Sequence, residues 1–84
     1  MSNIEYRNLR SLTARRLIRA PLDDGFLLTS QHGSHHRYHH IDGRRVTVPF
    51  TRQGDTFARG TLQSILEMQA RWTADDLVRL GLSY

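Results

Sequence analysis

The first clear pattern of apolar positions lies within residues 13–22 and predicts a helix. Apolar side chains recur there at near-helical spacing, namely Ala14, Leu17, Ile18 and Leu22. Thr13 precedes them and is a suitable N-cap. Pro21 has no backbone N–H, and its ring clashes with the carbonyl four residues back. We therefore expect this helix to kink or end near Ala20, with the chain turning at Gly25.

Three short segments with the composition of strands follow, at residues 26–30, 34–40 and 44–50. The connection between the second and third contains Asp42-Gly43, a pair that strongly favours a tight hairpin. These segments predict a three-stranded antiparallel sheet. Such a sheet needs a covering layer on at least one face to be stable.

Two helical patterns end the chain. In residues 61–72, apolar and long side chains stand at i, i+3, i+4 and i+7: Leu62, Ile65, Leu66 and Gln69. Residues 73–82 predict a last short helix, with Thr73 as its cap, Asp75 and Asp76 in its first turn and Gly81 at its end.

The order of these elements predicts one α+β domain spanning residues 1–84. Two helices would cover the same face of the three-stranded antiparallel sheet, and the opposite face would stay open. Residues 73–82 would form a C-terminal extension. Residues 1–11 carry no clear pattern, so they are either a loose N-terminal arm or an extra helical turn.

The alternation of side chains along each strand predicts what the open face carries. Val46, Val48 and Phe50 share one side, which we expect to be the core. The other strands should turn Phe26, Leu28, Ser34, His36, Tyr38 and His40 to that side. The open face then collects Leu27, Thr29, His35, Arg37, His39, Arg45 and Thr47.

Charge adds a class of partner to this picture. The chain has twelve basic residues, all arginine, against eight acids, for a net charge of +4. Ten of the twelve arginines precede residue 60. This surplus favours an anionic partner, and arginine can bond two phosphate oxygens at once. A genome that prefers arginine explains the missing lysine equally well, but it does not explain the net charge.

Other classes are excluded or disfavoured by composition. Without cysteine there are no disulfides and no thiolate zinc sites. No apolar run has the length of a membrane span and no signal peptide is visible, so we expect a cytoplasmic protein without a membrane partner.

All five histidines lie between His32 and His40. Their spacing fits a stripe on a helix, which would favour zinc, but Gly33 and Ser34 disfavour a helix there. On a strand only His35 and His39 could reach one ion. We therefore expect no metal cofactor, although a structural or metal-carrying protein remains an alternative.

Histidine also suits ribonuclease chemistry, because its ordinary pKa of about 6.5 lets it take and give a proton near neutrality. Cleavage of RNA needs a base for the 2′-hydroxyl proton, an acid for the 5′-oxygen and positive charge near the phosphorus. A histidine between Arg37 and Arg45 meets these needs. From composition alone, the favoured interpretation is that these histidines are ordinary polar strand residues.

Four segments in this order resemble one family. "LTARRLIRAPLDDGFLL", "GSHHRY", "RRVTVPF" and "ARGTLQSIL" are similar to the HicA (YcfA-like) toxins of prokaryotic type II toxin–antitoxin systems. The tail "WTADDLVRLGL" resembles the C-terminal extension of many members. The resemblance covers about residues 12–82 and implies an α-β-β-β-α fold like a double-stranded-RNA-binding domain.

The resemblance also implies an activity and partners. HicA toxins are metal-independent mRNA interferases, and their catalytic histidine follows Gly-Ser, which selects His35 here. The antitoxin would be HicB-like, with the toxin a monomer alone and part of a hetero-oligomer with its antitoxin. Many relatives carry a second histidine after the "VP" of the third strand, where this chain has Phe50 and Thr51. His39 or His32 would have to take that role.

We thus expect an endoribonuclease with His35 as general acid/base. Its RNA would be held by Gly33, Ser34, Arg37, His39, Arg45 and Thr47. The alternative is a module of the same fold that binds duplex RNA without cleaving it.

Overall fold

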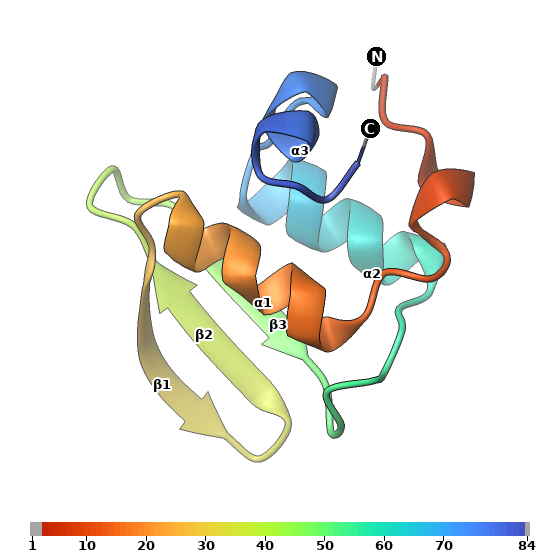
Figure 1. Cartoon of the computed structure of the whole chain (residues 1–84). Coiled ribbons are helices and arrows are strands. Elements are labelled where there is room, and N and C mark those ends of the chain that lie inside the picture. Colours follow the sequence, from red (N-terminus) through yellow and green to blue (C-terminus); the bar gives the residue numbers. More distant parts are fainter. Residues whose placement is uncertain (1–2, 84) are drawn as a thin grey trace.

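The computed structural model describes residues 3–83 and confirms the predicted α+β fold (Figure 1). The elements in chain order are the 3₁₀-helix η1 (Tyr6–Leu9), α1 (Ala14–Asp23), β1 (Leu27–His32), β2 (His35–His39), β3 (Arg45–Pro49), α2 (Arg59–Gln63), the π-helix η2 (Ser64–Gln69) and α3 (Ala74–Arg79). η2 continues α2 directly. Among the described residues, no helix is long and apolar enough to cross a membrane.

The sheet has the order β1-β2-β3, and both strand pairs are antiparallel. β1 turns into β2 through two residues, Gly33 and Ser34. Gly33 has φ +58° whereas Ser34 is not left-handed, which fits a type II′ turn with glycine at its first position. The pairing of β1 and β2 shifts between Leu28 and Ser30, so Thr29 forms a bulge there. The turn fixes which residues face each other at this end of the sheet.

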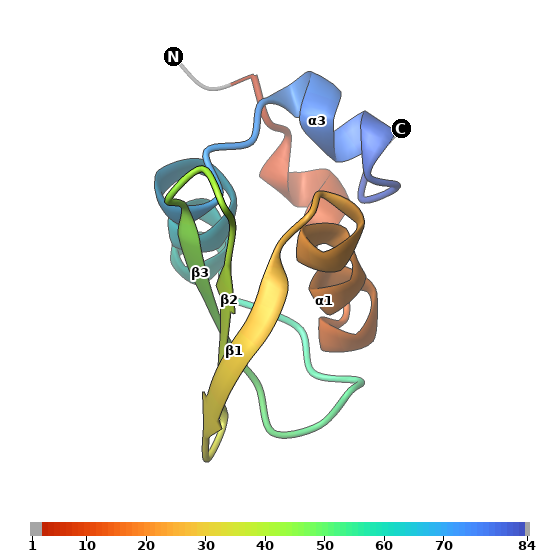
Figure 2. The same cartoon turned by 90° about the vertical axis from the view of Figure 1, so that its left-hand side faces the viewer.

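One face of the sheet forms the core, as predicted. Tyr38, Val46 and Val48 are buried together with Leu17 of α1 and with side chains of the α2–η2 helix. α1 lies across this face, and the view along the sheet shows no helix over the hairpin end of β1 and β2 on the other side (Figures 1 and 2). α2 and η2 lie alongside β3, at the edge of the sheet.

Two side chains predicted for the core are half exposed. Leu28 pairs with Tyr38 and so points to the covered side, but β1 is an outer strand and 50% of Leu28 is exposed. Leu22, in the last turn of α1, is 49% exposed.

The helix does not end near Ala20, so this part of the prediction is wrong. α1 continues through a buried Pro21 to Asp23. A proline in the final turn removes only one amide donor from the helix. The Pro21 carbonyl also gains a new partner, because the N–H of Phe26 donates to it at 2.8 Å and turns the chain toward β1.

The N-terminal segment is part of the core rather than a loose arm. Tyr6 and Leu9 of η1 are buried. The Tyr6 hydroxyl donates a hydrogen bond to Glu67 of η2. Burial, followed by the neighbouring Glu67 carboxylate, raises the pKa of Tyr6 above its ordinary value, so this hydroxyl remains protonated at neutral pH. The extra helical turn was the correct one of the two predicted alternatives.

The C-terminal helix begins as the sequence predicts. The Thr73 hydroxyl accepts a hydrogen bond from the N–H of Asp76, and the Asp76 carboxylate accepts one from the N–H of Thr73, which is a capping box. Arg71, two residues before Thr73, has φ +60°. The N–H of Trp72 reaches back to the Leu66 carbonyl at 2.8 Å, so Arg71 takes the left-handed position that usually holds glycine at a helix end.

Candidate active site

The tip of the β1–β2 hairpin brings two histidines to the same side of the sheet. His32 and His35 flank the two-residue turn and are direct cross-strand partners. Residues that oppose each other in an antiparallel pair have Cβ atoms about 5 Å apart. Both side chains are exposed. Two imidazoles therefore stand side by side on the uncovered face.

The predicted open-face array is assembled by the register of β2 and β3. Arg37 pairs with Thr47, and His39 pairs with Arg45, so these side chains share the face of His35. Arg37 and Arg45 are exposed. Within residues 3–83 neither of these two arginines forms an ion pair or a side-chain hydrogen bond. Their positive charges are available to a bound anion.

A cavity of about 390 Å³ adjoins His35 and is formed between the sheet and the start of the helix beside it. The strand residues in its wall are His35, Thr47 and Pro49. The helix supplies Gly60, Thr61, Ser64, Ile65 and Gln69. Hydroxyl and amide groups thus lie across the cavity from an exposed imidazole.

Gln69 connects the two walls of this cavity. Its Oε1 accepts a hydrogen bond from the backbone N–H of Thr47 at 2.8 Å, and its Nε2 donates to the Ser64 hydroxyl at 2.9 Å. The free edge of β3 is therefore bonded to the helix by a side chain. Sequence periodicity marked Gln69 only as part of the apolar helix face. It gave no sign that Thr61 and Ser64 would face a strand.

The other two histidines belong to the folded frame. His36 is half-buried, and its Nδ1 lies 3.1 Å from the Ser34 carbonyl oxygen and 3.3 Å from that of Val48. Its ring stacks on Phe50 with 4.0 Å between centroids. Phe50 thus packs on the covered side, away from His35.

His40 is held through both of its ring nitrogens. Its Nε2 lies 3.0 Å from the carbonyl oxygen of Asp24, and its Nδ1 lies 3.0 Å from the backbone nitrogen of Asp42 and 3.0 Å from the Asp42 carboxylate. Its ring contacts the edge of Phe26 at 5.0 Å. His36 and His40 face the covered side as predicted.

The five histidines are therefore divided between two sides of the sheet. Over residues 3–83, no three histidine or carboxylate side chains come together in a way that could hold a metal ion. His39 lies four residues along β2 from His35, a distance of about 13 Å along a strand. Of the two residues considered as a second proton-transfer group, only His32 is a direct neighbour of His35.

The remaining predicted site residues, Gly33 and Ser34, shape the hairpin mainly through their backbone. Gly33 provides the left-handed turn. The Ser34 carbonyl accepts a hydrogen bond from the N–H of Phe50 at 2.9 Å and contacts His36. The hairpin tip is thereby joined to the end of β3, which fixes the position of His35.

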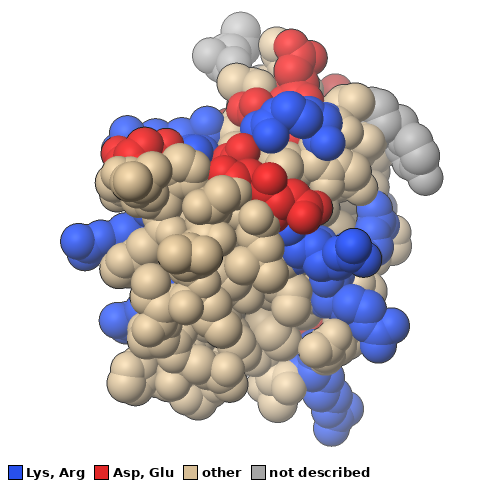
Figure 3. Space-filling model, turned by 60° about the vertical axis from the view of Figure 1, so that its left-hand side comes forward, with Lys and Arg blue, Asp and Glu red and all other residues tan. Residues whose placement is uncertain are grey.

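Charge is unevenly distributed over the molecule. In Figure 3 most acidic side chains gather at the upper end, toward α3, while arginines flank a wide uncharged area over β1. The hairpin tip lies at the opposite, lower end in Figure 1. An anion therefore meets less repulsion at the histidine pair than at the α3 end.

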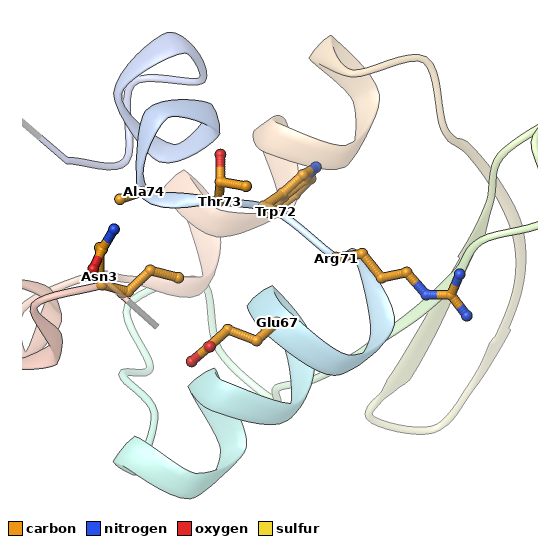
Figure 4. A pocket seen from close by; sticks show the side chains of 7 residues that line it. Asn3, Glu67, Arg71, Trp72, Thr73 and Ala74 are labelled. Atoms are coloured by element: carbon orange, nitrogen blue, oxygen red, sulfur yellow. The ribbon is translucent and has the colours of Figure 1, made fainter. Parts of the chain in front are cut away.

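Another cavity, of about 550 Å³, lies elsewhere and has no histidine in its lining (Figure 4). It lies between the N-terminal segment, η2 and the start of α3. The one carboxylate among its lining residues belongs to Glu67, which already accepts a hydrogen bond from the Tyr6 hydroxyl. The Arg71 side chain extends away from this hollow toward the sheet. This cavity offers no acid–base pair comparable to that at the hairpin.

The arrangement at the hairpin can hold a phosphodiester and move protons on either side of it. Two exposed imidazoles lie side by side, the guanidinium groups of Arg37 and Arg45 lie on the same face, and hydroxyl groups form the opposite wall. This combination supports acid–base cleavage of a phosphate ester without a redox step.

Comparison with known families gives an independent result. The family model described as the HicA toxin of bacterial toxin–antitoxin systems matches residues 14–71, which is more than half of the chain. The matched segment runs from the start of α1 to Arg71 and includes the whole histidine cluster. No curated protein matches the chain significantly.

Proposed function

Because the chain belongs to the HicA family of bacterial toxins, we propose that it is a metal-independent endoribonuclease that cleaves mRNA with His35 as general base or acid. A toxin role and the existence of an antitoxin follow from membership in this family. The ribonuclease chemistry is the part proposed here. The observation that carries it is the exposed His35 beside the cavity lined by Thr61, Ser64 and Gln69.

The reaction needs no external reagent. One imidazole takes the proton of a ribose 2′-hydroxyl, and the 2′-oxygen then forms a bond to the adjacent phosphorus. The bond from phosphorus to the 5′-oxygen breaks, and that oxygen leaves with a proton from a second acid. The products are a 2′,3′-cyclic phosphate and a free 5′-hydroxyl, so atoms and protons balance within the RNA and the two acid–base groups.

The second group in this scheme is His32. It opposes His35 across the two-residue hairpin, whereas His39 lies too far along β2 to share one phosphate with His35. Phe50 cannot take the role, since it is apolar and stacks on His36. A pair on neighbouring strands can hold its two rings on either side of one phosphodiester.

Charge stabilisation comes from the same face. As the 2′-oxygen attacks, negative charge grows on the phosphate oxygens, and guanidinium groups nearby lower the energy of that state. Arg37 lies beyond His35 on β2, and Arg45 lies next to His39 on β3. They would hold the flanking backbone phosphates, with Thr47 and the Thr61 and Ser64 hydroxyls as neutral partners.

The antitoxin in this proposal is HicB-like and covers the histidine face. An acidic surface could replace the RNA backbone against Arg37, Arg45 and His35. Opposite charges would speed its association with the toxin. The toxin would then be inactive because RNA and antitoxin compete for one face.

The test is cleavage of RNA in vitro by purified protein. We expect His35→Ala to reduce the rate by at least about a hundredfold, which is the usual contribution of one general acid–base group. The wild-type protein should remain active in excess EDTA and should produce 2′,3′-cyclic phosphate ends. A folded His35→Ala protein that binds RNA normally, together with a wild-type protein that binds but never cleaves, would instead identify a binding module.

A further inference from the structure

A third cavity, of about 510 Å³, lies where the N-terminal 3₁₀-helix meets the start of α2. These two segments are far apart in sequence and lie side by side at the right of Figure 1. The walls are cationic and aromatic, and the side chains that matter are Arg7, Arg10, Arg59, Tyr6 and Phe57. We call this cavity the arginine pocket.

The arginine pocket has more positive charge than its own carboxylate can neutralise. Glu5 is the one acid among its lining residues, and it lies 3.7 Å from Arg7 with both side chains largely exposed. Such an exposed pair is weak. Arg10 and Arg59 form no ion pair within residues 3–83. The net charge of the pocket therefore favours an anionic ligand.

The aromatic walls hold part of this charge in place. The Arg59 guanidinium lies over the Tyr6 ring, with 5.4 Å from its carbon to the ring centroid. Tyr6 is itself fixed by burial and by its hydrogen bond to Glu67. Phe57 is half-buried and adds an apolar surface at the same opening. Arginines beside aromatic rings are the combination that grips single-stranded nucleic acid.

The arginine pocket and the cavity at His35 share the first turn of α2. Arg59 and Leu62 line the arginine pocket, while Gly60 and Thr61 line the cavity at His35. Residues this close on a helix present adjacent faces of the same turn. An extended chain that leaves the histidine site can therefore pass over the start of α2 and enter the arginine pocket.

We propose that the arginine pocket binds backbone phosphates of a single-stranded RNA segment that adjoins the segment held at His35. This inference rests on the proposed function, because it takes the cavity at His35 as the place where RNA reacts. Arg7 and Arg10 precede residues 14–71, the segment matched by the family model. The pocket would lengthen the bound RNA and raise affinity without reading bases.

The test is binding of a labelled single-stranded RNA of about 12 nucleotides, a typical single-strand site length, measured by fluorescence anisotropy. All its 2′-hydroxyls are methylated so that it cannot be cleaved. The variant combines Arg7→Gln with Arg10→Gln. The matched control combines Arg15→Gln with Arg19→Gln, two exposed arginines on α1 that lie outside both cavities. Thermal melting checks that both proteins are folded.

We expect the first pair to weaken binding by about tenfold and to reduce the slope of log affinity against log salt by about 0.7 for each arginine. The control pair should change the affinity by less than about twofold. Equal losses in the two variants would overturn the proposal, because they would indicate unspecific attraction by net charge. Unchanged binding in the first variant would overturn it as well.

A polyglutamate peptide of the same charge provides the remaining comparison. If it binds as tightly as the RNA and loses binding in the first variant, the pocket is made for an acidic protein and the RNA proposal is wrong. Failure of the proposed function is recognised separately. The wild-type protein could bind RNA without cleaving it, while the Arg7→Gln and Arg10→Gln variant binds RNA more weakly. This result would support the arginine pocket and reject only the catalytic role of His35.

Discussion

The carboxylate of Asp24 accepts a hydrogen bond of 2.9 Å from the indole Nε1 of Trp72. Its other oxygen accepts one of 3.0 Å from Arg79, and Arg44 lies 3.3 Å away as an ion-pair partner. Asp24 thereby joins the end of α1, the strand entry at Arg44 and the C-terminal helix. Its side chain is only 12% exposed, so these contacts are little screened by water.

We expect Asp24→Ala to lower the free energy of unfolding by about 3 kcal/mol. The substitution leaves the indole N–H of Trp72 without its acceptor. It also removes one anionic partner of the partly buried Arg44 guanidinium, which keeps its hydrogen bonds to Asp42 and to the Ala70 carbonyl. In a domain of this size that loss corresponds to a decrease in melting temperature of roughly 12–24 °C. The matched control is Asp23→Ala, at an exposed neighbour whose side chain has no hydrogen bond or ion pair within residues 3–83, and it should change stability by less than about 0.5 kcal/mol. Similar losses in both variants would contradict the role given to Asp24.

The same network predicts how stability depends on pH. Burial alone would raise the pKa of Asp24, but the hydrogen bonds from Trp72 and Arg79 and the charges of Arg79 and Arg44 outweigh it, and the pKa is lowered. A folded pKa below the unfolded one means that the unfolded chain takes up the proton first. The stabilisation is therefore complete above the ordinary carboxyl pKa of about 3.9 and is lost as the pH falls through the folded pKa.

Urea unfolding between pH 7 and pH 2.5 measures this dependence. We expect the difference in stability between wild type and Asp24→Asn to be largest at neutral pH and to shrink in acid. Three other carboxyl groups, those of Asp42, Asp55 and Asp76, also have lowered pKa values, chiefly through hydrogen bonds from backbone N–H groups. They are present in both proteins, so the comparison isolates Asp24. A difference that stays constant over this range would refute the assignment.

His32 and His39 should differ in their effect on RNA cleavage. His32 is the cross-strand partner of His35, and His39 is two positions beyond Arg37 on the same strand. We expect His32→Ala to reduce the cleavage rate at saturating RNA by about a hundredfold, as the loss of a proton-transfer group does. His39→Ala should mainly weaken RNA binding. If His39→Ala lowers the saturated rate and His32→Ala does not, the second group has been assigned wrongly.

Arg37 and Arg45 should contribute to affinity in a way that depends on salt. Replacing either by glutamine should weaken binding to unrelated RNA sequences alike, because contacts to phosphate carry no base information. The slope of log affinity against log salt should decrease by about 0.7 to 0.9 for each. Arg19→Gln, on α1 and on the covered side of the sheet, is the control. An unchanged slope in both test variants would locate the RNA on another face.

Arg71 is expected to be a site where a smaller residue stabilises the fold. A residue other than glycine with φ +60° is conformationally strained, and Arg71 occupies the glycine position of a helix end. We expect Arg71→Gly to raise the free energy of unfolding by about 1 kcal/mol over that of Arg71→Ala. The alanine variant removes the same side chain and keeps the strain. Equal melting temperatures for the two variants would show that no strain is relieved.

The sequence predicts the sheet and the strand wall of the cavity at His35. Both depend on the alternation of side chains along each strand, which can be read from the sequence. Alternation along β2 and β3 is enough to group His35, Arg37 and Arg45 on one face, and Gly33 indicates the tight turn that precedes them. The bulge at Thr29 does not disturb this, because it lies beyond the segment that pairs His32 with His35. Periodicity is therefore a sufficient guide wherever neighbours in sequence are also neighbours in space.

The helical wall of the cavity at His35 could not be predicted from local periodicity. Ser64 and Gln69 reach the site because the helix packs along β3, and that contact joins residues 22 positions apart. Pro21 was misjudged for a related reason, since its cost was taken for a helix interior and it lies in a final turn. The N-terminal residues lack any periodic pattern, and only tertiary packing shows that Tyr6 and Leu9 belong to the core.

The two-residue hairpin also determines the order in which the site can be assembled during folding. A hairpin closes within microseconds, since its ends have little chain entropy to lose. His32 and His35 therefore become neighbours as soon as this local step occurs, before distant segments need to meet. The bond between Gln69 and Thr47 closes a longer loop and must wait for the helix to dock on β3. Under the proposed function, the complete site thus forms late, at the step that brings the last third of the chain against a hairpin that is already formed.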